Sequence, residues 1–585
     1  MKKISFVVPV FFAMSALVIA GCSSLKYMKK NADKVTYTVV PEILETHAGK
    51  VDMGIQSLYP EGYFGKKVIL TVTPVLKYSN GETALTPYVL QGEKVKDNNK
   101  VIPYATGGSN GYKASVNYSK DMLRSDLELR IKATEGKKSL DFAPKQIARG
   151  VIATSTLVDN SPIAIIGLLK KANTSGVYDP TIDKYQRIVP DAYMADLVYL
   201  INSSEVRTKE LTKAEIDHLN KYIAEAYKSD RKELKGVEIS AYASPDGTLE
   251  LNSKLAGKRE GTATKEVEGN MKKNKVKADL TSKNTPEDWE GFKALMEKSN
   301  IQDKDLILRV LAMYSDPEVR EREIKNLSSA FTKVADEILP QLRRAKITAS
   351  VNLIGRTDAE ISGLALSDPS KLNQAELLYA ATLTDNEATQ KSIYTSFTKI
   401  YADDWRGFNN LGFIQMNEGD FAAAGANYQK ADQLDPKNPI IQNNLGCVAL
   451  KSDQWVKAEI LFGAATGAGK EVKENMGILK IKQGEYETAV KYLGEGSTSY
   501  ANRGLAQLLN GDNAGALKTL NAAPVESGRI AYFKAIAYAR TGKASQMYEA
   551  LVNAMKKDPA YKTIAQNDLE FAKYANEQNF KLLFN

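Results

Sequence analysis

The stretch Asn409-Asn410-Leu411-Gly412 decides the fold of the C-terminal part of this 585-residue chain, because it recurs. The same four residue types return 34 positions later at Asn443-Asn444-Leu445-Gly446. The Leu-Gly pair has counterparts at Met476-Gly477 and, more weakly, at Arg503-Gly504. An alanine stands twelve positions after each of the four glycines: Ala424, Ala458, Ala489 and Ala516. A period near 34 residues predicts a stack of helical hairpins, in which small side chains let paired helices approach closely.

This pattern resembles the tetratricopeptide repeat family. The resemblance implies an α-solenoid over residues 366–585, with flanking hairpins around 375–401 and 530–555 that continue or cap the stack. Pro436 falls after the second helix of the first complete unit and should end it. The residues expected to fill the spaces between neighbouring repeats are Phe408, Tyr428, Phe462 and Leu493.

Arrays of this family usually bind a peptide or a helix of another protein on their concave face, so the resemblance implies a protein partner in the groove. The candidate groove residues are Asn409, Asn410, Asn443 and Asn444. Their amides would hydrogen-bond an extended backbone if they line the groove, and would otherwise satisfy local turns or water. Cys447 follows a repeat glycine and is expected to be a buried small residue.

The N-terminus carries a second signal. Two lysines precede an apolar run from residue 4 to residue 19, which is short for a bilayer span and typical of a cleaved signal peptide. The residues Ile19-Ala20-Gly21-Cys22 resemble the lipobox of bacterial lipoproteins, which implies acylation of Cys22. The alternative is an ordinary secretory signal with an incidental cysteine. The chain has only two cysteines, so acylation of Cys22 leaves Cys447 without an intrachain disulfide partner.

Residues 22–40 are interpreted as a short tether. They lack the acidic run that sends some lipoproteins to the cell surface, so we expect an outer membrane lipoprotein that faces the periplasm. Each buried methylene of an acyl chain contributes about 0.8 kcal/mol, and the several chains implied by the family chemistry should hold the protein on the membrane. The membrane side and the leaflet stay open.

Residues 41–185 are predicted to form a β-rich domain. Runs such as 67–72 and 127–131 alternate with a period of two, which is typical of half-buried strands. Asn80-Gly81 predicts a tight hairpin turn, and a small antiparallel sandwich or barrel fits strands of this length. No histidine and acidic cluster with metal-ligand spacing is visible here, and the role of this domain stays open.

Between residues 186 and 365 strands and helices alternate. The stretch 237–247, which ends in Ser244-Pro245-Asp246-Gly247, together with Asn252 and Arg259 resembles the OmpA C-terminal peptidoglycan-binding family. About 60 residues separate the segment at 286–300 from the last strand, so we predict an α/β domain with a helical insert that includes a long charged helix over 317–339.

In that family a loop aspartate and a helix arginine hold the zwitterionic end of diaminopimelate. Arg259 matches the arginine, whose planar fork suits a carboxylate. Ser244 stands where the aspartate is expected, and the nearest acid is Asp246. The resemblance therefore implies a peptidoglycan site formed by Arg259, Asp246, Ser244 and Asn252, and the loss of the aspartate leaves its retention open.

Other function classes are disfavoured. The chain has two histidines, His47 and His218, and no recognisable nucleophile, phosphate loop or zinc spacing, so we expect neither an enzyme nor a cofactor. The net charge of +9 is spread without a lysine or arginine block, which disfavours nucleic acid. Two hypotheses remain: a membrane-anchored envelope scaffold that binds peptidoglycan and proteins, or a protein-only adaptor or assembly subunit. The protein partner and the oligomeric state stay open.

Overall fold

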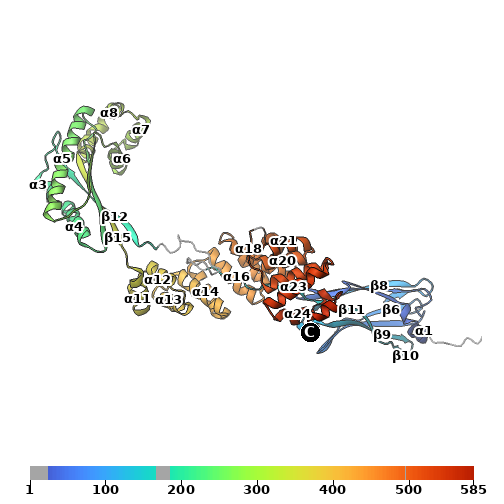
Figure 1. Ribbon diagram of the computed structural model, residues 1–585. Helices are drawn as coiled ribbons and strands as arrows, with labels where there is room; N and C mark the ends of the chain where they lie inside the picture. The colour runs from blue at the N-terminus through green and yellow to red at the C-terminus, as the bar shows by residue number, and fades with distance from the viewer. Residues whose placement is uncertain (1–23, 166–184, 495, 585) are drawn as a thin grey trace, which may run out of the picture. The chain divides into compact units, whose positions relative to one another are not determined.

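The computed structural model describes residues 24–165, 185–494 and 496–584, so Cys22 and the predicted signal peptide at 1–21 lie outside the described residues. The chain forms two compact units (Figure 1). The terminal unit combines Met1–Asp179 with Thr398–Asn585, and the inserted unit is Pro180–Phe397. The β-rich domain and the repeats, which lie at opposite ends of the sequence, therefore belong to one unit. Across the described ranges, no helix has the length and apolarity needed to cross a bilayer.

The β-rich domain is one eleven-stranded, mostly antiparallel sheet with the path β1-β3-β2-β11-β9-β4-β6-β7, to which β8, β10 and β5 add at β3, β9 and β4. The strands are β1 (Thr36–Val40), β2 (Ile43–His47), β3 (Lys50–Tyr59), β4 (Ile69–Tyr78), β5 (Gly81–Ala84), β6 (Tyr88–Gly92), β7 (Lys100–Ile102), β8 (Gly108–Asn117), β9 (Ser125–Glu135), β10 (Lys138–Asp141) and β11 (Lys145–Ile152). Burial alternates along β9, as its period of two predicts. The expected hairpin forms, and Tyr78 pairs with Gly81 across it.

The segment predicted as a tether is part of this domain from residue 24 onward. Helix α1 (Ser24–Lys30) buries Leu25 and Met28 against the sheet, and a 3₁₀ turn, η1 (Ala32–Lys34), leads into β1. Tyr63 Oη donates to the carbonyl of Met28 at 3.1 Å. The polar sequence of this stretch predicts a free linker, but apolar side chains three positions apart suffice to dock one helical face.

The inserted unit contains a four-stranded sheet with the order β12-β15-β13-β14. Its strands are β12 (Ile188–Val198), β13 (Lys232–Tyr242), β14 (Leu280–Thr285) and β15 (Arg344–Ile354). Helices α4 (Ala214–Lys228) and α5 (Leu249–Lys273) pack against the sheet, and α4 buries the stripe of Ile216, Leu219 and Ile223 that its spacing predicts. The expected alternation of strands and helices is present, while membership of the OmpA-like family stays a prediction.

The helical insert follows β14 as α6 (Trp289–Lys298), α7 (Lys304–Met313), α8 (Pro317–Lys325), α9 (Ser328–Lys333), η4 (Val334–Ile338) and α10 (Leu339–Leu342). The long helix expected over 317–339 is therefore wrong, because α8 ends at Lys325. Ile324, Val334 and Ile338 are buried in a small core with α6 and α7, so the segment folds back over this core instead of running straight. Helices α11 (Asp358–Ser367) and α12 (Gln374–Ala380), expected in or beside the repeats, belong to the inserted unit.

Five helical hairpins follow α13 (Glu387–Ile400), as the 34-residue period predicts. The pairs are α14 (Trp405–Glu418) with α15 (Phe421–Leu434), α16 (Pro439–Lys451) with α17 (Trp455–Ala464), α18 (Lys470–Gln483) with α19 (Tyr486–Tyr492), α20 (Tyr500–Leu509) with α21 (Asn513–Asn521), and α22 (Gly528–Arg540) with α23 (Ala544–Lys557). α24 (Ala560–Asn567), η7 (Leu569–Phe571) and α25 (Gln578–Leu582) close the array. The predicted small residues are at the helix contacts: Ala424, Ala458, Ala489 and Ala516 are each 0% exposed.

Candidate peptide-binding groove

An extended segment of the same chain lies against the first helices of the repeats. After β11 a short 3₁₀ turn, η3 (Thr154–Leu157), leads into residues 158–165, which we call the clasp segment. It was expected to belong to the β-rich domain. Its residues instead contact side chains that follow by about 240 to 370 positions in the sequence.

Three residues of the clasp segment have both main-chain groups bound by one asparagine. The Asp159 N–H donates to Asn502 Oδ1 at 2.8 Å, and Asn502 Nδ2 donates back to the Asp159 carbonyl at 3.1 Å. Ile163 forms the same pair with Asn475 at 2.7 and 2.8 Å. Ile165 forms it with Asn444 at 2.7 and 2.6 Å.

The chemistry of this contact is main-chain recognition. In an extended chain the N–H and the C=O of one residue point to the same side, and a carboxamide presents a donor beside an acceptor. One asparagine therefore satisfies both groups of one residue without touching its side chain. Such a groove selects an extended conformation before it selects a sequence.

The asparagines also bind each other and form a ladder along the groove. Asn444 Nδ2 donates to Asn409 Oδ1 at 2.8 Å, and Asn475 Nδ2 donates to Asn443 Oδ1 at 2.9 Å. Asn443 Nδ2 reaches the Ile163 carbonyl at 3.0 Å. Because no side chain of the ladder is more than 1% exposed, water does not compete for these bonds.

Sequence reasoning found part of this ladder. Asn409 Nδ2 lies 3.3 Å from the Ile165 carbonyl, so three of the four candidate asparagines contact the clasp segment. The fourth, Asn410, accepts a bond from Asn409 at 3.1 Å. Asn475 and Asn502 were missed. Their signal was present, since each stands two positions before a repeat glycine, as Asn410 and Asn444 do.

Further contacts fasten the clasp segment along its length. Arg529 Nη1 lies 2.5 Å from Asp159 Oδ2, and Lys451 Nζ donates to the Asn160 carbonyl. Cys447 is buried, as expected, and its thiol donates to the Ile163 carbonyl at 3.4 Å. Burial raises the pKa of this thiol, so it stays protonated and acts as a weak donor.

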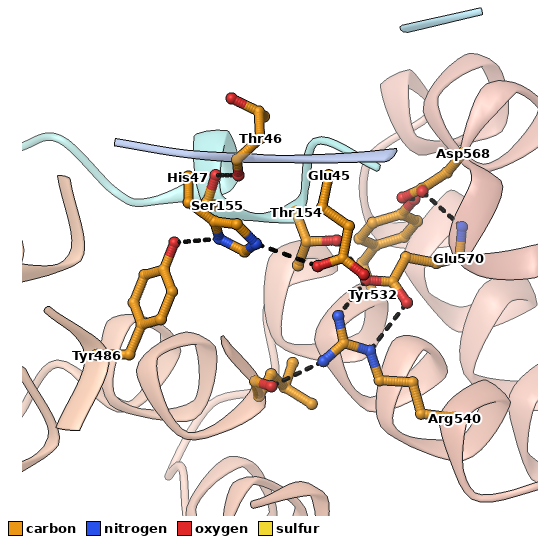
Figure 2. A network of polar contacts seen from close by, with 11 residues as sticks. Glu45, Thr46, His47, Thr154, Ser155, Tyr486, Tyr532, Arg540, Asp568 and Glu570 are labelled. Carbon is orange, nitrogen blue, oxygen red and sulfur yellow. Dashed lines mark hydrogen bonds and ion pairs between the residues drawn. The ribbon is translucent and has the colours of Figure 1, made fainter. Parts of the chain in front are cut away.

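The β-rich domain meets the repeats through side chains of β2 and η3 (Figure 2). His47 Nδ1 lies 2.6 Å from Tyr486 Oη, and His47 Nε2 lies 3.1 Å from Glu45 Oε2. On the other side, Thr154 Oγ1 donates to Glu570 Oε1 at 2.6 Å. Arg540 holds the same carboxylate through its Nε atom at 2.9 Å. His47, in which the sequence shows no function, is thus an interdomain contact.

Asp568 lies within this junction. Tyr532 Oη donates to Asp568 Oδ2 at 2.6 Å, and the Glu570 N–H donates to Asp568 Oδ1 at 3.0 Å. Burial, followed by the nearby charge of Glu570, raises the pKa of Asp568 to about 6. By contrast, the hydrogen bond with His47 is the main cause that lowers the pKa of Glu45.

In the inserted unit, Arg259 faces inward. Its guanidinium donates to the carbonyls of Ser203, Tyr242 and Leu200 at 2.9, 2.9 and 3.2 Å, and the residue is 0% exposed. The guanidinium also lies over the Tyr199 ring, 5.2 Å from its centroid. Each nitrogen of the proposed stem-peptide arginine therefore donates to a backbone carbonyl, and the residue is closed to solvent.

The other candidate peptidoglycan residues also have partners within the inserted unit. Ser244 Oγ donates to Asp246 Oδ1 at 2.6 Å, and Arg343 Nη2 lies 3.2 Å from Asp246 Oδ2. Asn252, which is 3% exposed, donates to the Gly247 carbonyl at 3.0 Å and to Glu287 Oε1 at 3.2 Å. Asp246 thus already has a cationic partner, and it is not Arg259.

No family model matches the chain, and no curated protein matches it significantly. Among solved structures, a tetratricopeptide repeat protein from Parabacteroides merdae is 13% identical with a TM-score of 0.29, and the match covers 45% of this chain and 96% of that one. YrrB, described as a TPR protein with an unusual peptide-binding site, is 20% identical with a TM-score of 0.25, over 28% and 92%. PilF of Pseudomonas aeruginosa is 14% identical with a TM-score of 0.29, over 38% and 97%.

Proposed function

We propose that this protein is a scaffold lipoprotein of the cell envelope, anchored through Cys22 to the outer membrane and facing the periplasm. The single observation that supports the scaffold role is the asparagine ladder, which is built to bind an extended polypeptide. In this chain the ladder holds the clasp segment, and so fastens the β-rich domain to the repeats. The proposal of an anchor rests on the Ile19–Cys22 motif. In the sequence, the inserted unit separates the two segments that form the terminal unit.

A protein partner that uses this groove has to replace residues 158–165. Because the ladder binds main-chain groups, an extended strand of a partner meets the same donors and acceptors. The clasp segment has the advantage of covalent linkage, which acts as a high effective concentration. Partners that bind the groove are therefore expected to be extended segments tethered close by, in an assembly that this scaffold organises.

Hydrogen exchange of the clasp amides tests the ladder. Asn475→Ala removes the two bonds that Asn475 forms with Ile163, including the one that the Ile163 N–H donates. Each bond contributes about 1 kcal/mol, so the Ile163 amide should exchange at least about fivefold faster. Asn427→Ala is the matched control, because Asn427 contacts only Gln415 and the Ala423 carbonyl within its own hairpin. Equal protection of the Ile163 amide in both variants would remove the ladder as a binding device.

Of the two hypotheses for the inserted unit, the protein-only adaptor has the better support. A stem-peptide carboxylate reaches Arg259 only if three backbone carbonyls give up their donors, and each stranded carbonyl costs about 1–3 kcal/mol. The carboxylate of Asp246 is already paired with Arg343, so it would attract a diaminopimelate ammonium less strongly. We therefore propose that this unit serves protein contacts, and that peptidoglycan binding through Arg259, Asp246, Ser244 and Asn252 is lost.

Co-sedimentation with isolated peptidoglycan tests this proposal. The full mature chain without its acyl group should not pellet above a background that added salt removes. Asp246→Asn, which keeps the shape of the loop but removes its charge, should behave in the same way. Salt-resistant pelleting that Asp246→Asn abolishes would instead restore the peptidoglycan tether.

A further inference from the structure

Helix α1 ties the predicted lipid anchor closely to one end of the β-rich domain. Ser24, its first residue, stands two positions after Cys22, and two residues span at most about 7 Å. The helix is docked through Leu25 and Met28, and Ser24 Oγ lies 3.4 Å from Glu135 Oε1 at the end of β9. If Cys22 is acylated, the surface around α1 must therefore lie against the bilayer.

That surface has a pocket of about 540 Å³ beside α1. Its wall combines Lys66, Lys67 and Lys94 with the rings of Tyr27 and Tyr104, which are each 42% exposed. Tyrosine is enriched where a protein meets the membrane interface, because its ring is apolar and its hydroxyl is polar. Lysine stems pack on apolar surface while the ammonium reaches outward.

The charge of this end is positive. Helix α1 adds Lys26, Lys29 and Lys30 to the three lysines of the pocket. The acids nearby are Glu135 in the wall, Glu93 beside it, Asp33 just after α1, and Asp141, whose carbonyl accepts a hydrogen bond from Lys29. Lys66 pairs with Glu93 at 3.2 Å and lies 5.3 Å from the Tyr104 ring centroid. Lys67 and Lys94 form no ion pair with any residue of the described ranges, so their charge is available to an external anion.

We propose that the α1 end of the β-rich domain, comprising α1 and this pocket, is a docking surface for anionic phospholipid headgroups. The inference rests on the proposed anchor, because it is the position of Cys22 that brings this end to a membrane. Basic side chains next to an acyl anchor add electrostatic attraction to the hydrophobic one. The lysines and tyrosines orient the domain on the bilayer. The acyl chains alone would hold the domain at the membrane without fixing its orientation.

This orientation sets where the repeats stand. Strand β9 has its Glu135 end at α1, and at its other end Arg124 Nη2 donates to the Gln566 carbonyl in the repeats at 2.9 Å. An eleven-residue strand spans roughly 35 Å. The β-rich domain thereby acts as a spacer that holds the repeats about one strand length from the headgroups.

Vesicle flotation tests the docking surface. The full mature chain with Cys22→Ser, which cannot be acylated, is mixed with phosphatidylcholine vesicles that contain or lack phosphatidylglycerol. We expect binding only to the anionic vesicles. The double variant Lys67→Glu/Lys94→Glu should weaken it more than about tenfold, because each lysine near an anionic surface strengthens binding about fivefold. Raised salt should weaken it as well.

The matched control reverses two lysines elsewhere in the same domain. Lys77→Glu/Lys120→Glu changes the net charge equally. Lys67 lies just before β4 begins at Ile69, and Lys77 lies eight residues further along that strand, which is roughly 26 Å. The control should bind anionic vesicles like the parent chain. Equal loss in both double variants, or binding to pure phosphatidylcholine of the same strength, would overturn the proposal.

Acylation is measured separately, by incorporation of a labelled fatty acid into the wild-type chain and the Cys22→Ser chain in cells. Absence of label in the wild type would overturn the anchor, whatever the vesicles show. Label in the wild type together with no vesicle binding would overturn the docking surface and leave the anchor. The two failures are thus distinguishable.

Discussion

Arg259 shows how one residue can match a motif and have different contacts. Its spacing from Asn252 fits the OmpA-like pattern, yet the side chain is buried under three carbonyls. Burial lowers its pKa to about 10, which still leaves it charged at neutral pH. From its position on α5, the charged guanidinium hydrogen-bonds the end of β13 and the loop after β12. Its role in this geometry is to hold the end of the sheet.

Substitution of Arg259 separates a structural from a ligand-binding role. Arg259→Ala should destabilise the inserted unit by at least about 3 kcal/mol, because it strands three carbonyls. Arg259→Lys should cost less but remain clearly destabilising, since one ammonium cannot match three diverging acceptors. Thermal unfolding measures both. The exposed Arg309→Ala is the control and should change stability by less than about 0.5 kcal/mol. An unchanged midpoint for Arg259→Ala would contradict the structural role.

At the scale of elements, the repeats are held by glycines that face large side chains of the partner helix. A Cβ built on Gly446 would lie 2.6 Å from Phe462 Cδ1, and one on Gly477 would lie 2.3 Å from Leu493 Cγ. Both partners were predicted to fill the spaces between neighbouring repeats, but each of these two contacts lies within one hairpin. The glycine and its partner are sixteen positions apart in each case, which is why the repeat is visible in the sequence.

Two glycine substitutions in one hairpin test this packing. Gly446→Ala should destabilise the terminal unit by about 1–3 kcal/mol, because the buried Phe462 has no room to move. Gly463→Ala in α17 meets nothing within 4 Å, and should be neutral or stabilise by up to about 1 kcal/mol through helix propensity. Denaturant unfolding compares the two. Equal effects would mean that the close approach is not what requires the glycine.

At the scale of the whole molecule, the terminal unit depends on contacts between the two ends of the chain. The ladder, the His47–Tyr486 contact and the Thr154–Glu570 hydrogen bond all join residues before 166 to residues after 408. Loss of the junction should therefore release the β-rich domain from the repeats.

The junction should depend on pH through Asp568. Its folded pKa of about 6 lies above the ordinary value of 3.8, so the neutral carboxyl contributes stability at low pH that is lost as the pH rises from about 4 to 6. Asp568→Asn stays neutral, so it should be more stable than wild type at pH 7.5, by up to about 3 kcal/mol. At pH 3.5 the two midpoints should coincide. A constant difference at both pH values would show that Asp568 does not titrate in this window.

Local sequence patterns predict much of this architecture. The 34-residue period predicts the helical hairpins, the period of two predicts strands such as β9, and the stripe of α4 predicts its buried face. These follow from the sequence because the spacing of apolar residues along an element decides which face must be buried. The asparagines of the groove were visible for the same reason, as they keep step with the repeat glycines.

What lies against each face was not encoded locally. The sequence predicts a groove but not its occupant, because Asp159 and Asn502 are 343 positions apart and no pattern links them. The inward turn of Arg259 and the docking of α1 likewise depend on the carbonyls and apolar surfaces that the folded chain brings near. Periodicity determines which face of each element must be buried. Long-range packing determines which other part of the chain buries that face.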